Sequence, residues 1–253
     1  IAGGGINTPA LLLRNGWGRF NHHIGRHLTL HPILPNIGIM YEPVLFYEGI
    51  PQCEYIEKFR SSDSSGFLIE GIGAQPVLTS FIIPSFGNSH RSIMEDFNKF
   101  SGNYIIVKDR PQGRVRASGD ENLSIAYGFH ELDKESMREG MKLSARILFQ
   151  SGAQKVVLNH VDLPLLENED EVKLIDKLEI SPNRIVLFSA HQMSSCRMGI
   201  NERTSVTDSH GKVHGTRNLY ISDASLFPTS LGYNPQLTIM ALAARNANFI
   251  LNN

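Results

Sequence analysis

The sequence contains few cysteines, and its positive and negative charges nearly balance. Only two cysteines, Cys53 and Cys196, occur among 253 residues, which excludes the disulfide framework that supports small secreted domains. Lys and Arg number 24 against 25 Asp and Glu, so the formal net charge is −1 and no basic excess exists to bind a nucleic acid. No apolar run approaches the length that crosses a bilayer. We therefore expect no nucleic-acid partner and no transmembrane segment.

The first residues lack the pattern of a signal peptide, since no basic segment followed by an apolar stretch opens the sequence. Ile1-Ala2-Gly3-Gly4-Gly5 is instead typical of a buried strand that enters a tight turn. Its glycines do not satisfy G-x-G-x-x-G, because Thr8 occupies the position of the third glycine. We expect the chain to begin within a domain, and the sequence leaves its compartment open.

Local patterns predict short strands in the middle of the chain, with helices between them. Residues 21–35, rich in His, Gly and Pro, are expected to form a loop. Residues 104–108 and 114–117 are expected to pair as a hairpin. Further strands are expected at 37–41, 67–72, 77–83, 123–129, near 156–158 and at 218–222. Strands in this order favour an α+β fold with an antiparallel sheet.

Helices are predicted from caps and from periodicity. Thr8 and Pro9 are typical of an N-cap followed by proline at the first helical position, so a short helix is expected there. The clearest helix spans 132–150, whose apolar stripe consists of Met137, Met141, Ala145 and Leu148. Two further helices are expected, at about 169–178 and from 234–235 through 250.

Histidines crowd the early loop. The spacing of the last three would suit metal ligands on a helix, but Gly25 and Pro32 interrupt the segment and no Cys, Asp or Glu joins the set. We therefore interpret them as solvated or structural residues and expect no metal site. The four are His22, His23, His27 and His31.

Residues 189–199, SAHQMSSCRMG, combine His191 and Cys196 in a stretch without a helical or strand period. A His–Cys dyad would predict a hydrolase with a reactive Cys196, whereas burial of a small thiol is the simpler interpretation. Asn234 is explained as the N-cap of the last helix. The same helix N-terminus would also stabilise an anionic ligand, such as the N1–C2=O edge of a reduced flavin.

Four segments in this order resemble the glucose–methanol–choline (GMC) family of flavin oxidoreductases. They are AGGGINTPALLLRNGWG, IGRHLTLHP, SAHQMSSCRMG and GKVHGTRNLYISDASLFPTSLGYNPQLTIMALAARNANFIL. The first departs from the family signature at Asn15 and Trp17, and the middle of the chain resembles the family only loosely. The details are most similar to the long-chain (fatty) alcohol oxidase branch, with sterol oxidases as relatives.

The resemblance implies roles for individual residues. His191 matches the catalytic base that removes the alcohol proton, and Asn234 matches the second catalytic position, which hydrogen-bonds the substrate oxygen. The residues that match FAD-contacting positions are Ala2, Gly3, Asp223, Ala224, Asn234, Pro235 and Gln236. The resemblance thus implies FAD as cofactor, and oxidation of a primary, long-chain alcohol by hydride transfer to flavin N5.

Family members are about twice this length, and their N-terminal half carries the G-x-G-x-x-G motif that holds the FAD diphosphate. The resemblance therefore implies the C-terminal half of such an enzyme. Residues 1–35 and 200–253 are expected to form part of an α/β, Rossmann-like FAD-binding domain, and 36–199 an antiparallel substrate domain. The alternatives are a non-catalytic fragment or split subunit that cannot hold FAD without the missing N-terminal half, a sterol oxidase-like enzyme, and the His–Cys hydrolase.

Overall fold

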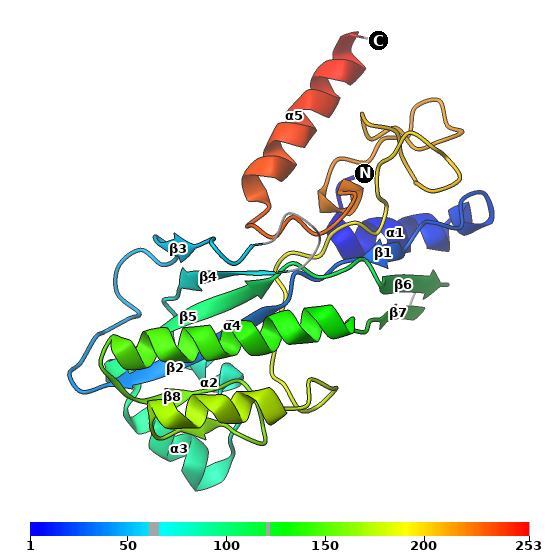
Figure 1. The fold of residues 1–253 in the computed structure, drawn as a ribbon. Coiled ribbons are helices and arrows are strands. Elements are labelled where there is room, and N and C mark those ends of the chain that lie inside the picture. Colours follow the sequence, from blue (N-terminus) through cyan, green and yellow to red (C-terminus); the bar gives the residue numbers. More distant parts are fainter. Residues whose placement is uncertain (61–65, 120–121, 253) are drawn as a thin grey trace. The chain divides into compact units, whose positions relative to one another are not determined.

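The chain folds into two units, each assembled from segments that are distant in the sequence (Figure 1). The computed structural model describes residues 1–60, 66–119 and 122–252. The terminal unit consists of Ile1–His31, Lys108–His130 and Ser189–Asn253, and the sheet unit of Pro32–Val107 and Glu131–Phe188. This division groups residues 32–35 with the sheet unit and residues 108–130 and 189–199 with the terminal unit. The expected FAD-binding part, 1–35 with 200–253, and substrate domain, 36–199, stay predictions.

The sheet unit is built on six antiparallel strands in the order β3-β4-β5-β2-β8-β9. The central strands β2 and β5 pair from Ile33 with Ile106 to Ile39 with Phe100. The strands are β2 (Ile33–Met40), β3 (Tyr55–Ile56), β4 (Phe67–Gly71), β5 (Phe100–Val107), β8 (Ala153–Val157) and β9 (Leu165–Leu166). The expected mixture of helices and antiparallel sheet is confirmed.

The long helix α4 (Glu131–Gln150) packs on this sheet (Figure 1). Its predicted stripe is buried: Met137, Met141, Ala145 and Leu148 are all at most 4% exposed. Gly140 lets the helix approach β5 closely, because a Cβ there would overlap the Ile105 side chain. The apolar period of the sequence therefore predicted both the helix and its buried face.

Several predictions for the sheet unit are wrong. Residues 77–82 lie in helix α2 (Pro76–Ile82), whose proline occupies the first helical turn. The expected hairpin does not form, because β5 pairs with β2 and β4, while β6 (Gly113–Ser118) belongs to the sheet of the terminal unit. The remaining helices of this unit are α3 (Gly87–Glu95) and the 3-10 segments η2 (Phe97–Lys99) and η3 (Glu169–Lys177).

The terminal unit contains a three-stranded antiparallel sheet in the order β1-β6-β7. Strand β1 (Arg26–Leu28) lies in the segment expected to be a loop, and β7 (Asn122–Ala126) is close to the predicted strand 123–129. Around them lie helix α1 (Gly4–Arg14), helix α5 (Gln236–Asn252) and the 3-10 turns η1 (Trp17–Arg19) and η4 (Ala224–Leu226). No helix in the described part of the chain is both long and apolar enough to pass through a membrane.

The N-terminal glycines begin a helix and do not end a strand, so that expectation is wrong. Gly3 is the N-cap of α1, and Thr8 lies inside the helix, where its hydroxyl accepts a hydrogen bond from the Gly3 amide. Residues 218–222 form no strand in the described structure. Their backbone instead holds Ile1, whose nitrogen donates to the Tyr220 carbonyl at 2.7 Å and whose carbonyl accepts from the Ser222 amide.

Candidate functional site

The segment that carries His191 is fixed by backbone hydrogen bonds on two sides. Met193 exchanges both of its backbone hydrogen bonds with Thr29, each at 3.0 Å. The Ser194 amide donates to the Ala224 carbonyl at 3.1 Å, which connects the segment to η4. A chain with no helical or strand period of its own is therefore ordered by pairing with two distant segments.

Helix α1 packs directly against the same segment through Gly5. A Cβ at Gly5 would lie 2.5 Å from the Gln192 carbonyl carbon and 2.9 Å from the Met193 nitrogen, so only glycine fits there. The Ser195 hydroxyl donates to the Gly5 carbonyl at 2.6 Å. This close approach explains Gly5, while the φ of 78° at Gly4 fits the turn expected from the sequence. The contact at Gly5 places α1 behind the backbone next to His191.

His191 forms a close pair with His31. Their Nδ1 atoms are 2.9 Å apart, although the residues are separated by 160 positions. His31 is fully buried, while His191 is partly exposed. Burial lowers the pKa of both rings, that of His31 to about 3, so both are neutral near pH 7. A half-buried neutral imidazole can accept a proton, as general-base catalysis requires.

Asp109 holds the backbone on which His31 sits. Its two carboxylate oxygens accept hydrogen bonds from the amides of Leu30, at 2.8 Å, and of His31, at 2.9 Å. The Tyr127 hydroxyl donates to the same carboxylate. Burial raises the pKa of Asp109, while these donors oppose that rise. His31 itself has a φ of 52°, a left-handed conformation that this carboxylate stabilises.

Asp223 connects the two segments that were expected to contact FAD. One carboxylate oxygen caps η4 through the Ser225 amide, at 2.8 Å. The other accepts from the Gly4 amide, at 3.0 Å, and from the Thr8 hydroxyl, at 2.5 Å. The structure thus places Asp223 and Ala224 next to the N-terminus of α1, where Ala2 and Gly3 are exposed.

An apolar cluster connects the start of α5 to the segment that carries His191. Ile239 and Leu242 of α5 pack against Met193, Ala224 and Phe227. The helix begins at Gln236, so Asn234 lies two residues before its first turn rather than directly at the cap position. Asn234 and Gln236 are exposed, and Pro235 is buried. Their closeness to the His191 ring remains a prediction.

Cys196 has the environment of a structural residue. It is fully buried in an apolar cluster with Leu12, Val206 and Ile221. Burial raises the pKa of its thiol, so the thiolate that a nucleophile needs does not form near neutral pH. These observations oppose the hydrolase alternative.

The early histidines divide into two groups. His31 pairs with His191, while the His23 Nδ1 lies 3.3 Å from the His27 Nε2 and the His23 Nε2 lies 2.6 Å from the Arg203 carbonyl oxygen. Burial lowers the pKa of His23, and that of His27 to about 4. Within the described ranges, no three His, Cys, Asp or Glu residues are arranged to hold a metal ion.

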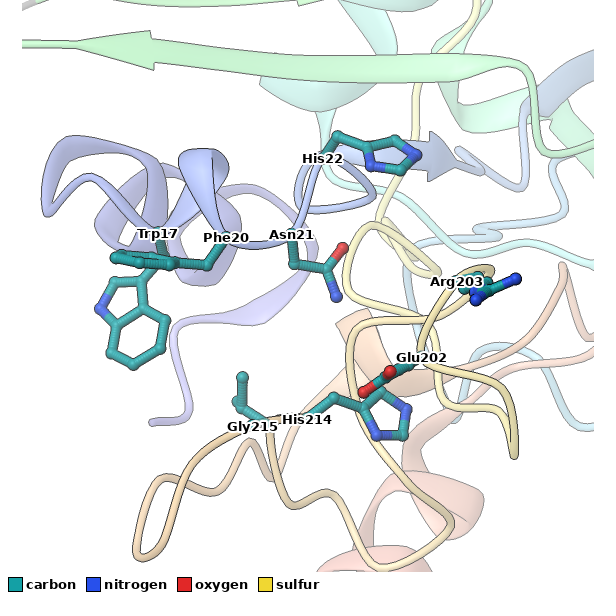
Figure 2. A pocket seen from close by; sticks show the side chains of 9 residues that line it. Trp17, Phe20, Asn21, His22, Glu202, Arg203, His214 and Gly215 are labelled. Atoms are coloured by element: carbon teal, nitrogen blue, oxygen red, sulfur yellow. The ribbon is translucent and has the colours of Figure 1, made fainter.

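A cavity of about 540 Å³ lies elsewhere in the terminal unit (Figure 2). Figure 2 shows Trp17 and Phe20 on one side of it, and Glu202 and His214 on the other. The remaining lining residues are Asn21, His22, Arg203, Val213 and Gly215. Neither His191 nor Asn234 lines this cavity, so its size alone does not identify it as the place of the chemistry.

Comparison with known proteins identifies the family of the chain. Residues 109–243, which include Asp109, His191 and the start of α5, match the family model described as GMC oxidoreductase. The chain belongs to the GMC oxidoreductase family. This family and the solved structures that the chain resembles are FAD-binding flavoenzymes.

Curated GMC relatives align over nearly the whole chain. A long-chain-alcohol oxidase of Arabidopsis thaliana, FAO3, is 30% identical over 96% of this chain and 34% of that protein. An uncharacterized GMC-type oxidoreductase of Mycobacterium tuberculosis is 27% identical over 96% of this chain and 38% of that protein. The chain therefore spans little more than a third of the length of these relatives.

Solved GMC structures share the fold at low identity. Formate oxidase from Aspergillus oryzae aligns with a TM-score of 0.64 and 17% identity, over 98% of this chain and 53% of that one. Pyridoxine 4-oxidase from Mesorbium loti aligns with a TM-score of 0.57 and 15% identity, over 100% of this chain and 51% of that one. At these identities the likeness concerns the fold alone.

Sequence reasoning missed three residues of the site. His31 was interpreted as structural, Asp109 as part of a turn and Tyr127 as a strand residue. Their shared role depends on contacts across long sequence separations, and no local spacing in the sequence indicates it. The repeated histidine in IGRHLTLHP was the only available signal.

Proposed function

We propose that this chain forms the catalytic half of an FAD-dependent alcohol oxidoreductase in which His191 is the general base. The observation that carries the proposal is the neutral, half-buried His191 ring, held against His31 on a segment that packs with α1, η4 and α5. Oxidation of a primary alcohol to an aldehyde needs such a base beside the bound cofactor.

The proton chemistry assigns one nitrogen of His191 to the substrate. Nδ1 faces His31, so Nε2 is the nitrogen that accepts the hydroxyl proton of the alcohol. When bound, FAD would supply the hydride acceptor for the two-electron oxidation of the alcohol to the aldehyde. Asn234 would donate a hydrogen bond from its amide to the alcohol oxygen and so orient it.

The described residues fit a flavin in three respects. The N-terminus of α5 at Gln236 is exposed, and its partial positive charge suits the anionic edge of a reduced flavin. Small residues on the same helix, Ala241, Ala244 and Ala247, are exposed and allow a flat ligand to approach. Ala2 and Gly3 leave the start of α1 similarly open beside Asp223 and Ala224. We assign these residues, with Pro235, to FAD binding.

A long-chain primary alcohol is the proposed substrate. Its support is the similarity to proteins named long-chain-alcohol oxidases, at 27–30% identity for three Arabidopsis thaliana members. A sterol is the competing substrate of the same reaction class. Turnover with a saturated C16 alcohol and with cholesterol, compared on one preparation, distinguishes the two.

Helix α5 supports a second candidate, in which this chain holds FAD only together with further polypeptide. Only Asn246 of α5 is buried, while Leu237 and Leu251 are 80% and 81% exposed. An apolar helix with so little cover favours association with another surface. The proposed partner is the N-terminal region that the longer relatives possess. Flavin absorbance of the purified chain, alone and after addition of that region, tests this candidate.

Anaerobic reduction of bound flavin by alcohol tests the proposed base. We expect His191→Ala to slow flavin reduction by about 10²–10⁴-fold, because proton removal matters mainly in the transition state. His22→Ala, which removes an exposed histidine of the same unit, is the matched control and should retain the wild-type rate. A wild-type reduction rate in the flavin-loaded His191→Ala protein would refute the assignment.

A further inference from the structure

We propose that His31 is a positioning residue for His191: it accepts a hydrogen bond at Nδ1 and thereby keeps the Nε2 of His191 free to take the substrate proton. This inference rests on the proposed function, and it adds a residue and an atomic role to it. The two Nδ1 atoms, 2.9 Å apart, are the observation that carries the inference.

A contact between two Nδ1 atoms constrains both tautomers. One ring must carry its proton on Nδ1 and donate, while the other must have a lone pair there and accept. If His31 donated, neutral His191 would carry its proton on Nε2 and could not act as a base there. The catalytic arrangement therefore requires His191 to donate from Nδ1 and His31 to accept.

The far side of the His31 ring shows that only one of its nitrogens has a partner. Its Nε2 is buried and has no hydrogen-bond partner among the described residues. A buried polar atom without a partner is uncommon in folded proteins and calls for an explanation. In the proposed tautomer this atom is an N–H, because a neutral ring that accepts at Nδ1 carries its proton on Nε2. The unpaired N–H costs stability at a position whose Nδ1 contacts His191.

The backbone around His31 is held firmly enough for such a role. The Asp109 carboxylate accepts from two consecutive amides, those of Leu30 and His31, and Tyr127 donates to the same carboxylate. His31 adopts a left-handed φ of 52° in this arrangement, with its Nδ1 2.9 Å from that of His191. The Ser189 hydroxyl also donates to the Leu30 carbonyl, which connects the two segments a second time.

The neutrality of His31 suits the step in which His191 becomes charged. When His191 takes the alcohol proton, its Nδ1–H becomes a charged donor, and a neutral acceptor stabilises it. Burial lowers the pKa of His31 to about 3, so it stays neutral and does not repel the new imidazolium. Among the described residues, the ionisable side chain that contacts the His31 ring is His191, and the Asp109 carboxylate contacts the His31 backbone amide.

Two variants of similar shape distinguish the hydrogen-bond acceptor of His31 from the side-chain volume that it fills. His31→Asn retains an oxygen at the position of Nδ1, while His31→Leu has the same branching and no acceptor. Leucine is less tolerant than asparagine of a positive φ, so His27→Leu, at a φ of 67°, controls for backbone strain. His27 has no contact with His191 in the described structure; its ring pairs with His23.

In the flavin-loaded protein, we expect His31→Leu to lower kcat for alcohol about 10–100-fold, with KM changed less than about threefold. Activity is lost as pH falls through the pKa of the base, and a weaker acceptor lowers that pKa. The acid limb of the kcat profile should therefore move about one pH unit lower in His31→Leu. His31→Asn should recover most of the rate and the position of the limb, and His27→Leu should match the wild type.

Nitrogen-15 NMR of histidine-labelled protein gives a readout that needs no turnover. We expect His191 to be protonated at Nδ1 in the wild type and in His31→Asn, and to become a mixture of tautomers in His31→Leu. Wild-type His191 protonated at Nε2 would overturn the inference. Equal losses in the Asn and Leu variants, with an unmoved acid limb, would overturn it as well. Full flavin reduction in His191→Ala would instead refute the proposed function.

Discussion

Replacement of Gly5 by alanine tests whether helix α1 positions the His191 segment. The substitution should favour the helix itself, since alanine is preferred over glycine in a helix by about 1 kcal/mol. The new Cβ would nevertheless lie 2.5 Å from the Gln192 carbonyl carbon and 2.9 Å from the Met193 nitrogen. Both neighbours are backbone atoms and cannot rotate away. The helix or the His191 segment must therefore move by roughly 1 Å to restore van der Waals separation.

The expected loss of stability in Gly5→Ala follows from two opposing effects. Overpacking against atoms that cannot rotate away costs about 3 kcal/mol, the upper end of the usual range, and the helix preference offsets about 1 kcal/mol of it. A net loss of about 2 kcal/mol corresponds to a decrease in Tm of about 4–8 °C for a protein of this size. Because His191 lies one residue before Gln192, kcat should also fall by about 10–100-fold.

Thermal unfolding and anaerobic flavin reduction measure the two effects. Gly128→Ala is the matched control, because a Cβ there meets no atom within 4 Å and its φ is not positive. We expect this control to remain within about 0.5 kcal/mol of the wild type. A Gly5→Ala protein with the Tm and reduction rate of Gly128→Ala would refute the packing argument.

Three further predictions concern thiol access, acid stability and the core. Under native conditions iodoacetamide should modify exposed Cys53 and leave buried Cys196 intact until urea unfolds the protein; rapid native labelling of Cys196, seen by mass spectrometry, would contradict its burial. Burial lowers the pKa of His31 and so favours the neutral ring in the folded state. The contribution of His31 to the free energy of unfolding is therefore present above pH 6.5 and is lost as pH falls toward 3. Urea unfolding at pH 5 should therefore show about 2 kcal/mol less stability than at pH 7.5, and His31→Asn should reduce that difference. Met141→Ala should cost about 2–5 kcal/mol in the same assay, because this fully buried side chain lies between α4 and the sheet, and a smaller loss would indicate that the site collapses.

The sequence alone determined the features that depend on local pattern. The stripe of Met137, Met141, Ala145 and Leu148 repeats with the helical period, so both α4 and its buried face were predictable. The segments around His191 and Asp223 were recognisable because each is a continuous stretch of specific residues. The start of α5 was predicted to within two residues from Asn234-Pro235.

Local pattern misassigned elements wherever a distant partner decides the structure. The β-branched and aromatic residues of 77–83 predicted a strand, but Pro76 begins a helix there and no strand pairs with it. The hairpin expected across 104–117 fails because β2 and β4 pair with β5. Strand pairing is a long-range choice, which turn residues indicate only when the neighbouring strands are partners.

Only the tertiary structure decided the composition of the candidate site. His31 and His191 meet across 160 residues, and Asp109 reaches the His31 amide across 78. Gly5 is required by the backbone of Gln192, which no property of the N-terminal segment reveals. Such contacts depend on how the segments pack, and packing is specified by the whole core rather than by any one stretch of sequence. The residues proposed to carry the chemistry could be identified from the sequence, whereas the residues that contact and position them could not.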